Sequence, residues 1–400
     1  MTSPAVGRSQ ALFSWAAFSV VIAGVLTAWA DPLSGHLLHA CVLALAAAIL
    51  VRSHAAGRAA APHWLVAVPL MCAAWGLLQW RLGLTVYRFE TLNSAAAWAA
   101  RAAAAYIAWA VFERRQWHKV LNAMLYASAA IGVVGTFQWF TSQGKVFWLA
   151  AAPYTQRVIG PFLNRDHYAA FVELMLPVAL VRAVWDPRAR LAHAALAGFL
   201  FASVIACGSR AGFALAALEV MVLAAAALFR MPGRWRLVGA VAACIFFFSA
   251  VVGSQYSWER LSLPDPFAFR REMLAASVRM IRARPAVGFG LGTWPSVYPA
   301  YAVFDPPGVF MNHAHNDWAE WAAEGGVLFD VPLLAVALAA AVFARRSPWG
   351  LGVAVVFLHS FVDFPLQKPA LAILTFFLAG ALAAAFRTAN AALGAVRPKS

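Results

Sequence analysis

Residues 191–207 (LAHAALAGFLFASVIAC) and residues 211–230 (AGFALAALEVMVLAAAALFR) are two apolar runs with only Gly208, Ser209 and Arg210 between them. An α-helix needs roughly 20 residues to cross about 30 Å of hydrocarbon, so each run is close to the length of a transmembrane helix. The whole chain has the same character, since 63% of its 400 residues are hydrophobic and 12% are charged. A soluble core cannot hold so much apolar surface. The composition therefore predicts an all-α, polytopic membrane protein.

Apolar runs of this kind recur along the chain and predict about twelve transmembrane helices. The expected spans are 11–30, 35–51, 63–80, 93–112, 120–140, 167–185, 191–207, 211–230, 235–253, 326–344, 348–364 and 369–387. We interpret residues 1–400 as one membrane domain, because we find no internal repeat and no separate soluble domain. The first span is longer than the apolar part of a signal peptide, so we expect it to be retained.

Basic residues gather in alternate connections, which predicts the orientation of the spans. One set of connections, together with the two tails, holds more than half of the 31 lysines and arginines. These residues are Arg8, Arg52, Arg58, Arg114, Arg115, Lys119, Arg182, Arg188, Arg190, Arg230, Arg234, Arg236, Arg345, Arg346, Arg387, Arg397 and Lys399. By the positive-inside rule this side faces the cytoplasm. We therefore expect a multi-pass protein of the bacterial inner membrane with both termini cytoplasmic. Since the charges are scattered in ones to threes, the net charge of +15 does not predict a nucleic-acid partner.

One connection, residues 254–325, is long and falls on the periplasmic side of this topology. Connections of that length are usually functional, so we expect it to be a catalytic loop within the membrane domain. Residues 267–284 alternate apolar and arginine positions in a helix-like pattern that is too polar to span. Pro285 ends this pattern, and the glycines at 288, 290 and 292 predict a turn.

The densest polar cluster is residues 312–320, NHAHNDWAE, near the end of this loop. A neutral histidine can take a proton from a hydroxyl group, and a nearby carboxylate can fix its tautomer. The cluster therefore contains the parts of a general base. A second interpretation is equally open, in which Asp317 and Glu320 form a capping box for the following helix and the histidines only hydrate a loop.

Arginines are the other informative residues, because a planar, permanently charged guanidinium group suits phosphate oxygens. Those expected at the periplasmic side are Arg157, Arg165, Arg210, Arg270 and Arg271. Any single one could instead anchor a helix by reaching the lipid headgroups. Arg101 lies in the middle of an expected span, where an unpaired charge is costly, so we expect its side chain to face the interior of the helix bundle.

Cofactor chemistry has no clear signal in the chain. The four cysteines lie in apolar runs without a C-x-x-C pair, and no His or Asp group has metal-ligand spacing in the sequence. We therefore expect no structural disulfide, no metal site and no cofactor.

Four short motifs carry a resemblance to a known family. Gly160–Phe171 (GPFLNRDHYAAF) is similar to a stretch G-x-F-x-N-x-N-H-x-A, and Gly208–Gly212 (GSRAG) is similar to an S-R-A/G-G turn. Arg270–Glu272 precedes residues 285–290 as R-x-E precedes P-x-x-G-x-G. His315 and Asn316, followed by Gly326, are similar to an H-N-x9-G signature. Together these motifs resemble the O-antigen ligase and polymerase superfamily of membrane glycosyltransferases, and the resemblance covers roughly residues 130–365, in the family's order.

Three positions depart from the family pattern. Leu274 stands where the family often has Trp, Asp166 where Asn is common, and Phe329 where a second Gly is expected. None of these changes removes a proposed catalytic group.

The resemblance implies an inverting, metal-independent transfer of a glycan from an undecaprenyl-diphosphate carrier. Arg210 and Arg270 would bind the diphosphate, and His315, or alternatively His313, would deprotonate the acceptor hydroxyl. Further candidates for substrate binding are Arg157, Arg165, Arg271, Asn164, His167 and Asn316. The implied acceptor is lipid A core or a growing glycan, and membrane lipids would surround the protein.

Related functions stay open at this stage. A polysaccharide polymerase and a protein O-glycosylating enzyme would share the donor chemistry and differ only in the acceptor. A transporter or flippase of lipid-linked glycans is a different class, in which the same arginines bind without chemistry. Transporters more often have pseudo-repeated halves and broken helices at the midplane, whereas the polar residues here gather in one loop, which favours an enzyme.

Overall fold

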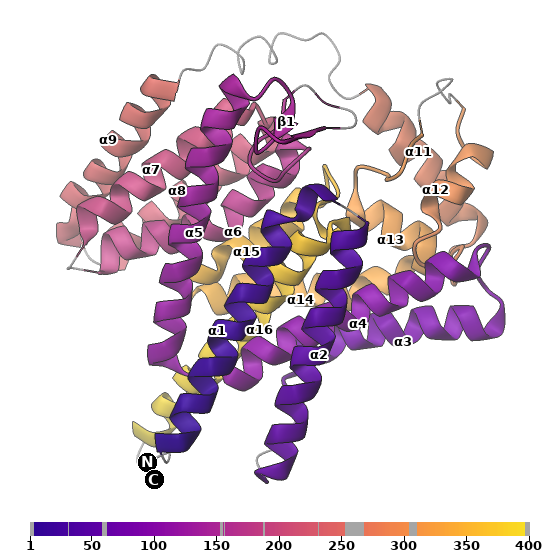
Figure 1. Ribbon diagram of the computed structural model, residues 1–400, viewed down its shortest axis with the longest axis horizontal. Helices are drawn as coiled ribbons and strands as arrows, with labels where there is room; N and C mark the ends of the chain where they lie inside the picture. Colours follow the sequence, from indigo (N-terminus) through magenta and orange to yellow (C-terminus); the bar gives the residue numbers. More distant parts are fainter. Residues whose placement is uncertain are drawn as a thin grey trace.

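The architecture is that of a helix bundle, shown in Figure 1 as a computed structural model of the chain. The structure describes residues 4–30, 32–57, 62–152, 155, 157–186, 189–230, 232–252, 268–303 and 310–396. The N-terminal helices are α1 (Pro4–Leu26), α2 (Leu33–Ala55), α3 (Trp64–Leu82), α4 (Arg88–Val111) and α5 (Arg114–Thr141). The central helices are α6 (Arg165–Trp185), α7 (Arg190–Cys207), α8 (Arg210–Arg230), α9 (Trp235–Val252), α11 (Ala268–Ala283), α12 (Trp294–Val297) and α13 (Asp317–Gly325). The C-terminal helices are α14 (Asp330–Ala344), α15 (Leu351–His359) and α16 (Pro369–Val396).

The expectation of an all-α protein is confirmed for the described residues. The exception is a two-stranded antiparallel hairpin, β1 (Lys145–Val146) with β2 (Ala150–Ala151), in the connection before α6. Short 3-10 turns, such as Val327–Phe329 before α14, make up the remaining regular structure.

Each expected span coincides with a helix, and many of these helices suit a membrane. Eight helical stretches are long and apolar enough to cross one, and they are formed by α2, α3, α5, α6, α7, α8, α14 and α16. Three shorter apolar helices cover residues 10–26, 235–251 and 348–359. The protein is thus a helical, polytopic membrane protein, and the exact number of twelve spans stays a prediction.

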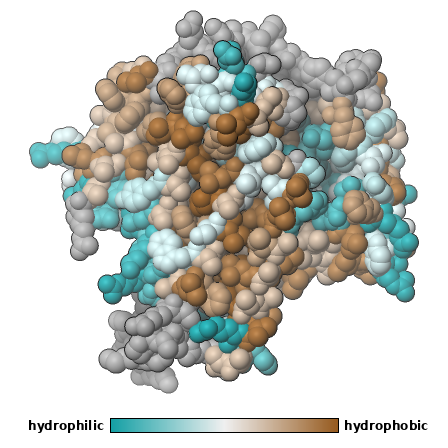
Figure 2. Space-filling view, viewed as in Figure 1, coloured by the Kyte–Doolittle hydropathy of each residue, from teal (hydrophilic) through white to brown (hydrophobic). Residues whose placement is uncertain are grey.

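The outer surface of the bundle carries many exposed apolar side chains, as a surface that faces lipid requires. Phe229, Leu149 and Phe246 have relative exposures of 89%, 86% and 77%. Figure 2 shows apolar residues spread across much of one face, with hydrophilic residues gathered toward its edges. In water this surface would be unfavourable, because each exposed aliphatic or aromatic side chain forgoes roughly 1.5–3 kcal/mol of burial energy. Hydrocarbon can solvate it.

The expected span 348–364 is too long at its C-terminal end. The helix α15 stops at His359, and residues 360–364 form a turn that carries Asp363. The side chain of Asp363 in this turn has no exposed surface, so it is buried by protein rather than exposed to lipid. The difference has a physical reason, since a charged side chain is tolerated at that depth only where protein groups pair with it.

The long segment after α9 contains a small core of its own. The predicted helix over 267–284 is confirmed as α11, which ends just before Pro285. Its residues Met273 and Met280 pack with Trp294 and Tyr298 in a separate hydrophobic cluster. Figure 1 places α11 and α12 at the upper right of the view, whereas the start of α1 and the end of α16 lie at the lower left.

The glycine turn at residues 288–292 joins this small core to the bundle. Gly288 and Gly290 have φ angles of +65° and +108°, and a Cβ on Gly288 would overlap the carbonyl group of Glu324. Gln79 of α3 completes the junction, because its Nε2 donates to Val287 O (2.7 Å) and its Oε1 accepts from Leu291 N (3.1 Å). The turn is therefore held against both α3 and α13.

Candidate functional site

Arg270 of α11 lies between two buried carboxylates that come from distant parts of the chain. Its Nη2 donates to Asp166 Oδ2 at 2.8 Å and to Asp363 Oδ2 at 3.1 Å. Its Nη1 donates to the carbonyl oxygen of Val362 at 2.9 Å. Although burial alone lowers the pKa of Arg270, the charges of Asp363 and Asp166 raise that pKa above its ordinary value. Arg270 is therefore a fixed positive charge in a set orientation.

His315 is bound to the second oxygen of the same Asp363 carboxylate. The distance from His315 Nδ1 to Asp363 Oδ1 is 3.2 Å, and the same oxygen accepts from Phe364 N at 2.8 Å. Since an ionised carboxylate only accepts hydrogen bonds, Nδ1 donates and Nε2 keeps the basic lone pair. His315 also has a φ of +52°, which is uncommon for a residue other than glycine and often marks a functional position.

The start of α6 places Asp166 next to Arg270. Asn164 is the N-cap of this helix, and its side chain accepts from Asp166 N at 2.8 Å. Ser209 Oγ donates to Asp166 Oδ1 at 2.6 Å and accepts from Gly212 N at 3.0 Å. The Gly208–Gly212 turn thus has a local role, because it delivers the serine hydroxyl that orients Asp166.

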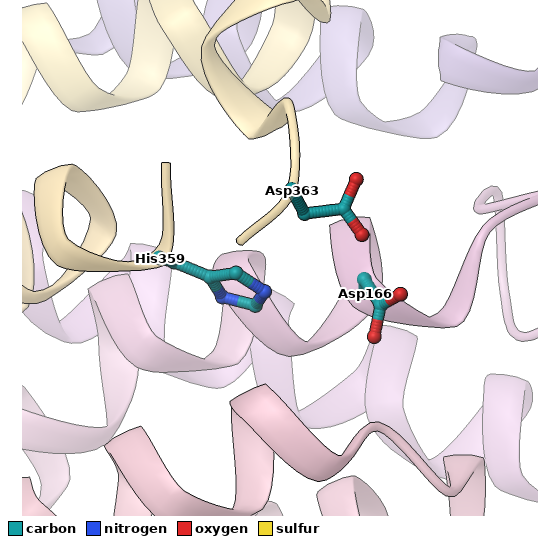
Figure 3. Close-up of side chains that lie close together, drawn as sticks. All are labelled: Asp166, His359 and Asp363. Carbon is teal, nitrogen blue, oxygen red and sulfur yellow. The ribbon is translucent and has the colours of Figure 1, made fainter. Parts of the chain in front are cut away.

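A buried histidine lies beneath these carboxylates, as Figure 3 shows. His359 points toward Asp166 and Asp363, and ligand-type atoms of the three residues all lie within 4.8 Å of one another. Its Nδ1 is 2.9 Å from Glu173 Oε1, while its Nε2 is buried without a hydrogen-bond partner among the described residues. These donors could hold a metal ion, but Arg270 already occupies one oxygen of each carboxylate.

His313 forms a second pair of the same kind with Glu320. Its Nδ1 is 2.9 Å from Glu320 Oε1, and Glu320 Oε2 accepts from Ala314 N at 2.7 Å. Burial raises the pKa of Glu320 to about 8, so this carboxyl group holds its proton more strongly than an ordinary one near neutral pH. Glu320 is therefore a weaker acceptor for the proton on His313 than an ionised carboxylate would be.

The prediction that Asp317 and Glu320 form a capping box is wrong, because another residue caps the helix. The N-cap of α13 is Asn316, whose Oδ1 accepts from Ala319 N at 2.9 Å and whose Nδ2 donates to Phe361 O at 2.7 Å. Asp317 Oδ2 instead accepts from Ser360 Oγ at 2.7 Å. Asn316 therefore has a structural role that the cluster alone did not reveal.

Three histidines and a lysine surround the aromatic ring of Phe364. The ring centroid of His313 lies 4.4 Å away in a stacked arrangement, and the rings of His315 and His167 approach edge-on at 4.6 and 4.7 Å. Lys368 Nζ is 5.5 Å from the same ring centroid. His167, His313 and Lys368 also line a cavity of about 340 Å³ between this site and the end of α1. His167 and His313 thus border a space that a ligand can enter.

The other candidate arginines lie at the starts of helices or in the connections around the site. Arg210 is the first residue of α8, next to Ser209, and Arg165 is the first residue of α6. The guanidinium of Arg157 lies 5.7 Å from the ring centroid of Trp139, and Arg271 is exposed on α11. Arg270 is thus the candidate arginine that the structure joins directly to the carboxylate that holds His315.

Arg101 has the buried position that its sequence context predicts, and the structure supplies its partners. Its relative exposure is 5%, its Nη2 donates to Leu366 O at 2.8 Å, and its guanidinium lies 4.1 Å from the ring centroid of Trp98. Leu366 directly follows the turn that carries Asp363, so Arg101 supports the backbone beside the site.

Sequence reasoning missed Asp363, His359, Glu173 and Phe364. All four lie inside expected apolar spans or at their ends, and the three ionisable residues among them carried a signal. Ionisable residues inside transmembrane segments are rare and usually functional, so HSFVD at 359–363 indicates a functional position as strongly as the polar cluster of the loop does. Phe364 had no such signal, because an aromatic residue at a span end is ordinary.

Comparison with known proteins gives one family match. Residues 195–328 match the family model described as O-antigen ligase, a region that contains Arg210, Arg270, His313 and His315. No curated protein matches the chain significantly. The matched region includes the second to fourth of the motifs recognised in the sequence, in their order. This match supports the resemblance to O-antigen ligases and polymerases that the motifs indicate.

Proposed function

We propose that the protein transfers a glycan from an undecaprenyl-diphosphate carrier to a hydroxyl group of lipid A core, at the periplasmic face of the inner membrane. The observation that carries this proposal is the shared carboxylate of Asp363, which accepts from His315 on one oxygen and from Arg270 on the other. A candidate base and a candidate diphosphate ligand are thereby held in one rigid unit. Both are contributed by the segment that precedes α14.

His315 is the proposed catalytic base. As the acceptor oxygen attacks the anomeric carbon, its proton moves to Nε2 of His315, and the bond between that carbon and the carrier's diphosphate oxygen breaks. The diphosphate leaves with the bonding electrons. Because the attack comes from the face opposite the leaving group, the configuration at the anomeric carbon inverts. Positioned proton transfer of this kind contributes roughly 10²–10⁴-fold to a rate.

Arg270 supplies positive charge to the leaving diphosphate. Asp166 and Asp363 fix its guanidinium, so no reorganisation is needed when charge develops on the leaving group. Arg210 assists, with Arg157 or Arg165 at the more distant phosphate oxygens. We propose that the reaction is metal-independent, because a cation bound by Asp166 and Asp363 would compete with Arg270 for the same oxygens.

The cavity of about 340 Å³ is the proposed entrance for one substrate. Trp29 and Phe162 in its wall offer aromatic faces, and His167 and Lys368 offer polar groups, a mixture that suits a sugar bearing acidic substituents. The apolar outer surface suits the polyprenyl tail, which stays in the membrane while the head group reacts.

The decisive experiment compares two histidine variants of the purified protein. We would incubate each with lipid-linked glycan and lipid A core and measure joined product, donor binding and monodisperse yield. His315→Ala should lose transfer while it keeps donor binding and yield, whereas His313→Ala should keep measurable transfer. Full transfer by His315→Ala would refute the base assignment, and donor binding without any transfer by the wild type would favour a carrier of lipid-linked glycans. Extension of the donor glycan without use of lipid A core would assign the protein as a polymerase.

A further inference from the structure

A second, larger cavity lies at the other end of α6 from the candidate site. Its volume is about 740 Å³, and Arg182 and Trp185 of the last turns of α6 line it. Asp166, in the first turn of the same helix, belongs to the candidate site. Sixteen residues separate Asp166 from Arg182, which corresponds to about 24 Å along a helix. The cavity is therefore remote from the proposed chemistry, and the predicted topology places it at the cytoplasmic face.

Three arginines from separate elements converge on this cavity. They are Arg182 of α6, Arg230 at the end of α8, and Arg346 just after α14. Arg182 Nη2 is 3.1 Å from His118 Nδ1, and Arg230 Nη2 donates to Arg345 O at 2.7 Å. These contacts orient the guanidinium groups of Arg182 and Arg230. Asp186 is the carboxylate in the lining, so the lining keeps a net positive charge.

The rest of the lining is aromatic and apolar. Trp117 and Trp349 have their ring centroids 5.7 Å apart, and Trp185 adds a third indole. Trp117 is 4% exposed, and its indole N–H is buried without a hydrogen-bond partner among the described residues. Val181 and Ala385 complete an apolar wall. Tryptophans of this kind favour the depth of lipid headgroups, where one side is apolar and the other is wet.

We propose that this cavity binds the phosphate-bearing headgroup of an anionic glycerophospholipid. The three arginines would contact the phosphate, the indole rings would pack against the glycerol and upper acyl region, and the acyl chains would leave along the apolar wall. Basic pockets between transmembrane helices at this face have the chemistry that recognises such headgroups. The volume lies in the range of small-ligand sites. This binding site is independent of the proposed glycan transfer.

The positive-inside rule by itself does not account for this arrangement. The rule requires basic residues in cytoplasmic connections, and Arg115 or Arg52 would satisfy it anywhere on that face. It does not require Arg182, Arg230 and Arg346 to line one concavity together with a buried indole. Convergence from three elements far apart in the sequence indicates a ligand that they share.

The test uses the full-length purified protein in neutral detergent. We would measure the midpoint of thermal unfolding during titration with phosphatidylglycerol, with phosphatidylcholine, and with inorganic phosphate, and count bound lipids by native mass spectrometry. The variant is Arg230→Gln with Arg346→Gln, both exposed positions whose replacement leaves the buried core intact. The matched control is Arg115→Gln, which is exposed near the start of α5 and does not line the cavity.

Phosphatidylglycerol should raise the unfolding midpoint and phosphatidylcholine should not. The double variant should need at least about tenfold more phosphatidylglycerol for the same shift, which corresponds to about 1.4 kcal/mol of binding energy, while the control should match the wild type. Equal responses to the two lipids, or equal losses in the double variant and the control, would overturn the proposal. If inorganic phosphate alone raised the unfolding midpoint as much as phosphatidylglycerol does, the ligand would be free phosphate and not a lipid headgroup. Glycan transfer plays no part in these measurements, so their outcome is separate from that of the proposed function.

Discussion

Asp363 Oδ1 lies 3.2 Å from Nδ1 of His315, and this contact joins the turn after α15 to the loop before α13. A carboxylate behind a histidine holds the ring in one orientation and one tautomer, and it stabilises the imidazolium that forms when the ring accepts a proton. Because Asp363 also binds Arg270, a change at this carboxylate should affect both the proposed base, His315, and the proposed diphosphate ligand, Arg270.

Asp363→Asn tests this relationship. The amide keeps the shape but removes the charge and can present its NH2 group to His315, so we expect turnover to fall by about 10²–10⁴-fold with folded yield unchanged. Donor binding should fall less, since Asp166 still binds Arg270. Turnover and its pH profile are the measurements, and Glu90→Gln is a control carboxyl group remote from His315. A wild-type pH profile in Asp363→Asn would show that the carboxylate has only a packing role.

Arg270→Lys should lose most activity although the charge is kept. A single ammonium group cannot bind Asp166, Asp363 and Val362 O and also present donors to two phosphate oxygens. Arg271→Lys should be milder, because the side chain of Arg271 is exposed on the surface of α11. Initial rates at subsaturating donor, at equal expression, distinguish the two variants. If Arg270→Lys turns over like the wild type, Arg270 does not bind the diphosphate.

Chelation should leave activity unchanged. The cluster of Asp166, His359 and Asp363 has metal-type ligands, but two of its oxygens already bind Arg270. We therefore expect equal initial rates in EDTA and in millimolar Mg²⁺ or Mn²⁺. Stimulation by either ion that disappears in His359→Ala would instead assign a metal site to this cluster.

Glu324→Gln should stabilise the protein at alkaline pH. Burial raises the pKa of Glu324 from 4.5 to about 8, so the folded state binds more protons than the unfolded state between these values. Stability from this group is therefore lost as the pH rises through that window. The amide can still accept from Trp294 N, as Glu324 Oε1 does at 2.8 Å.

The expected result is an unfolding midpoint about 2 °C or more above that of the wild type at pH 9, with a smaller difference at pH 5. Differential scanning fluorimetry across this range measures both. Parallel pH curves for the two proteins would contradict the assigned titration.

The orientation of the bundle has a direct test. A reporter fused after Ser400 should be active in the cytoplasm, and one inserted near Asp305 should report the periplasm, because the basic connections alternate along the chain. Activity of both reporters on one side would mean that the number of spans between the two positions is wrong by an odd number.

Much of the architecture was predictable because it depends on local composition. A run such as residues 211–230 must leave water whatever surrounds it, and α8 forms there. The arginines within residues 267–284 likewise predicted the polar helix α11, and Pro285 predicted where this helix ends. The boundary of α15 was not predictable, because residues 360–364 leave the helix to satisfy partners in other segments.

The helical membrane fold, the family resemblance and the candidates His315 and Arg270 all follow from residue types and short spacings. Which groups act together depends instead on the packing of the helices. Asp166 and Asp363 are separated by nearly 200 residues, yet both bind Arg270, and Glu173 reaches His359 from another helix. Such pairs depend on the way helices pack side by side, and no local pattern specifies that packing. The physical reason is that a buried charge is stable only beside an opposite charge or a hydrogen-bond donor, wherever in the chain that partner lies.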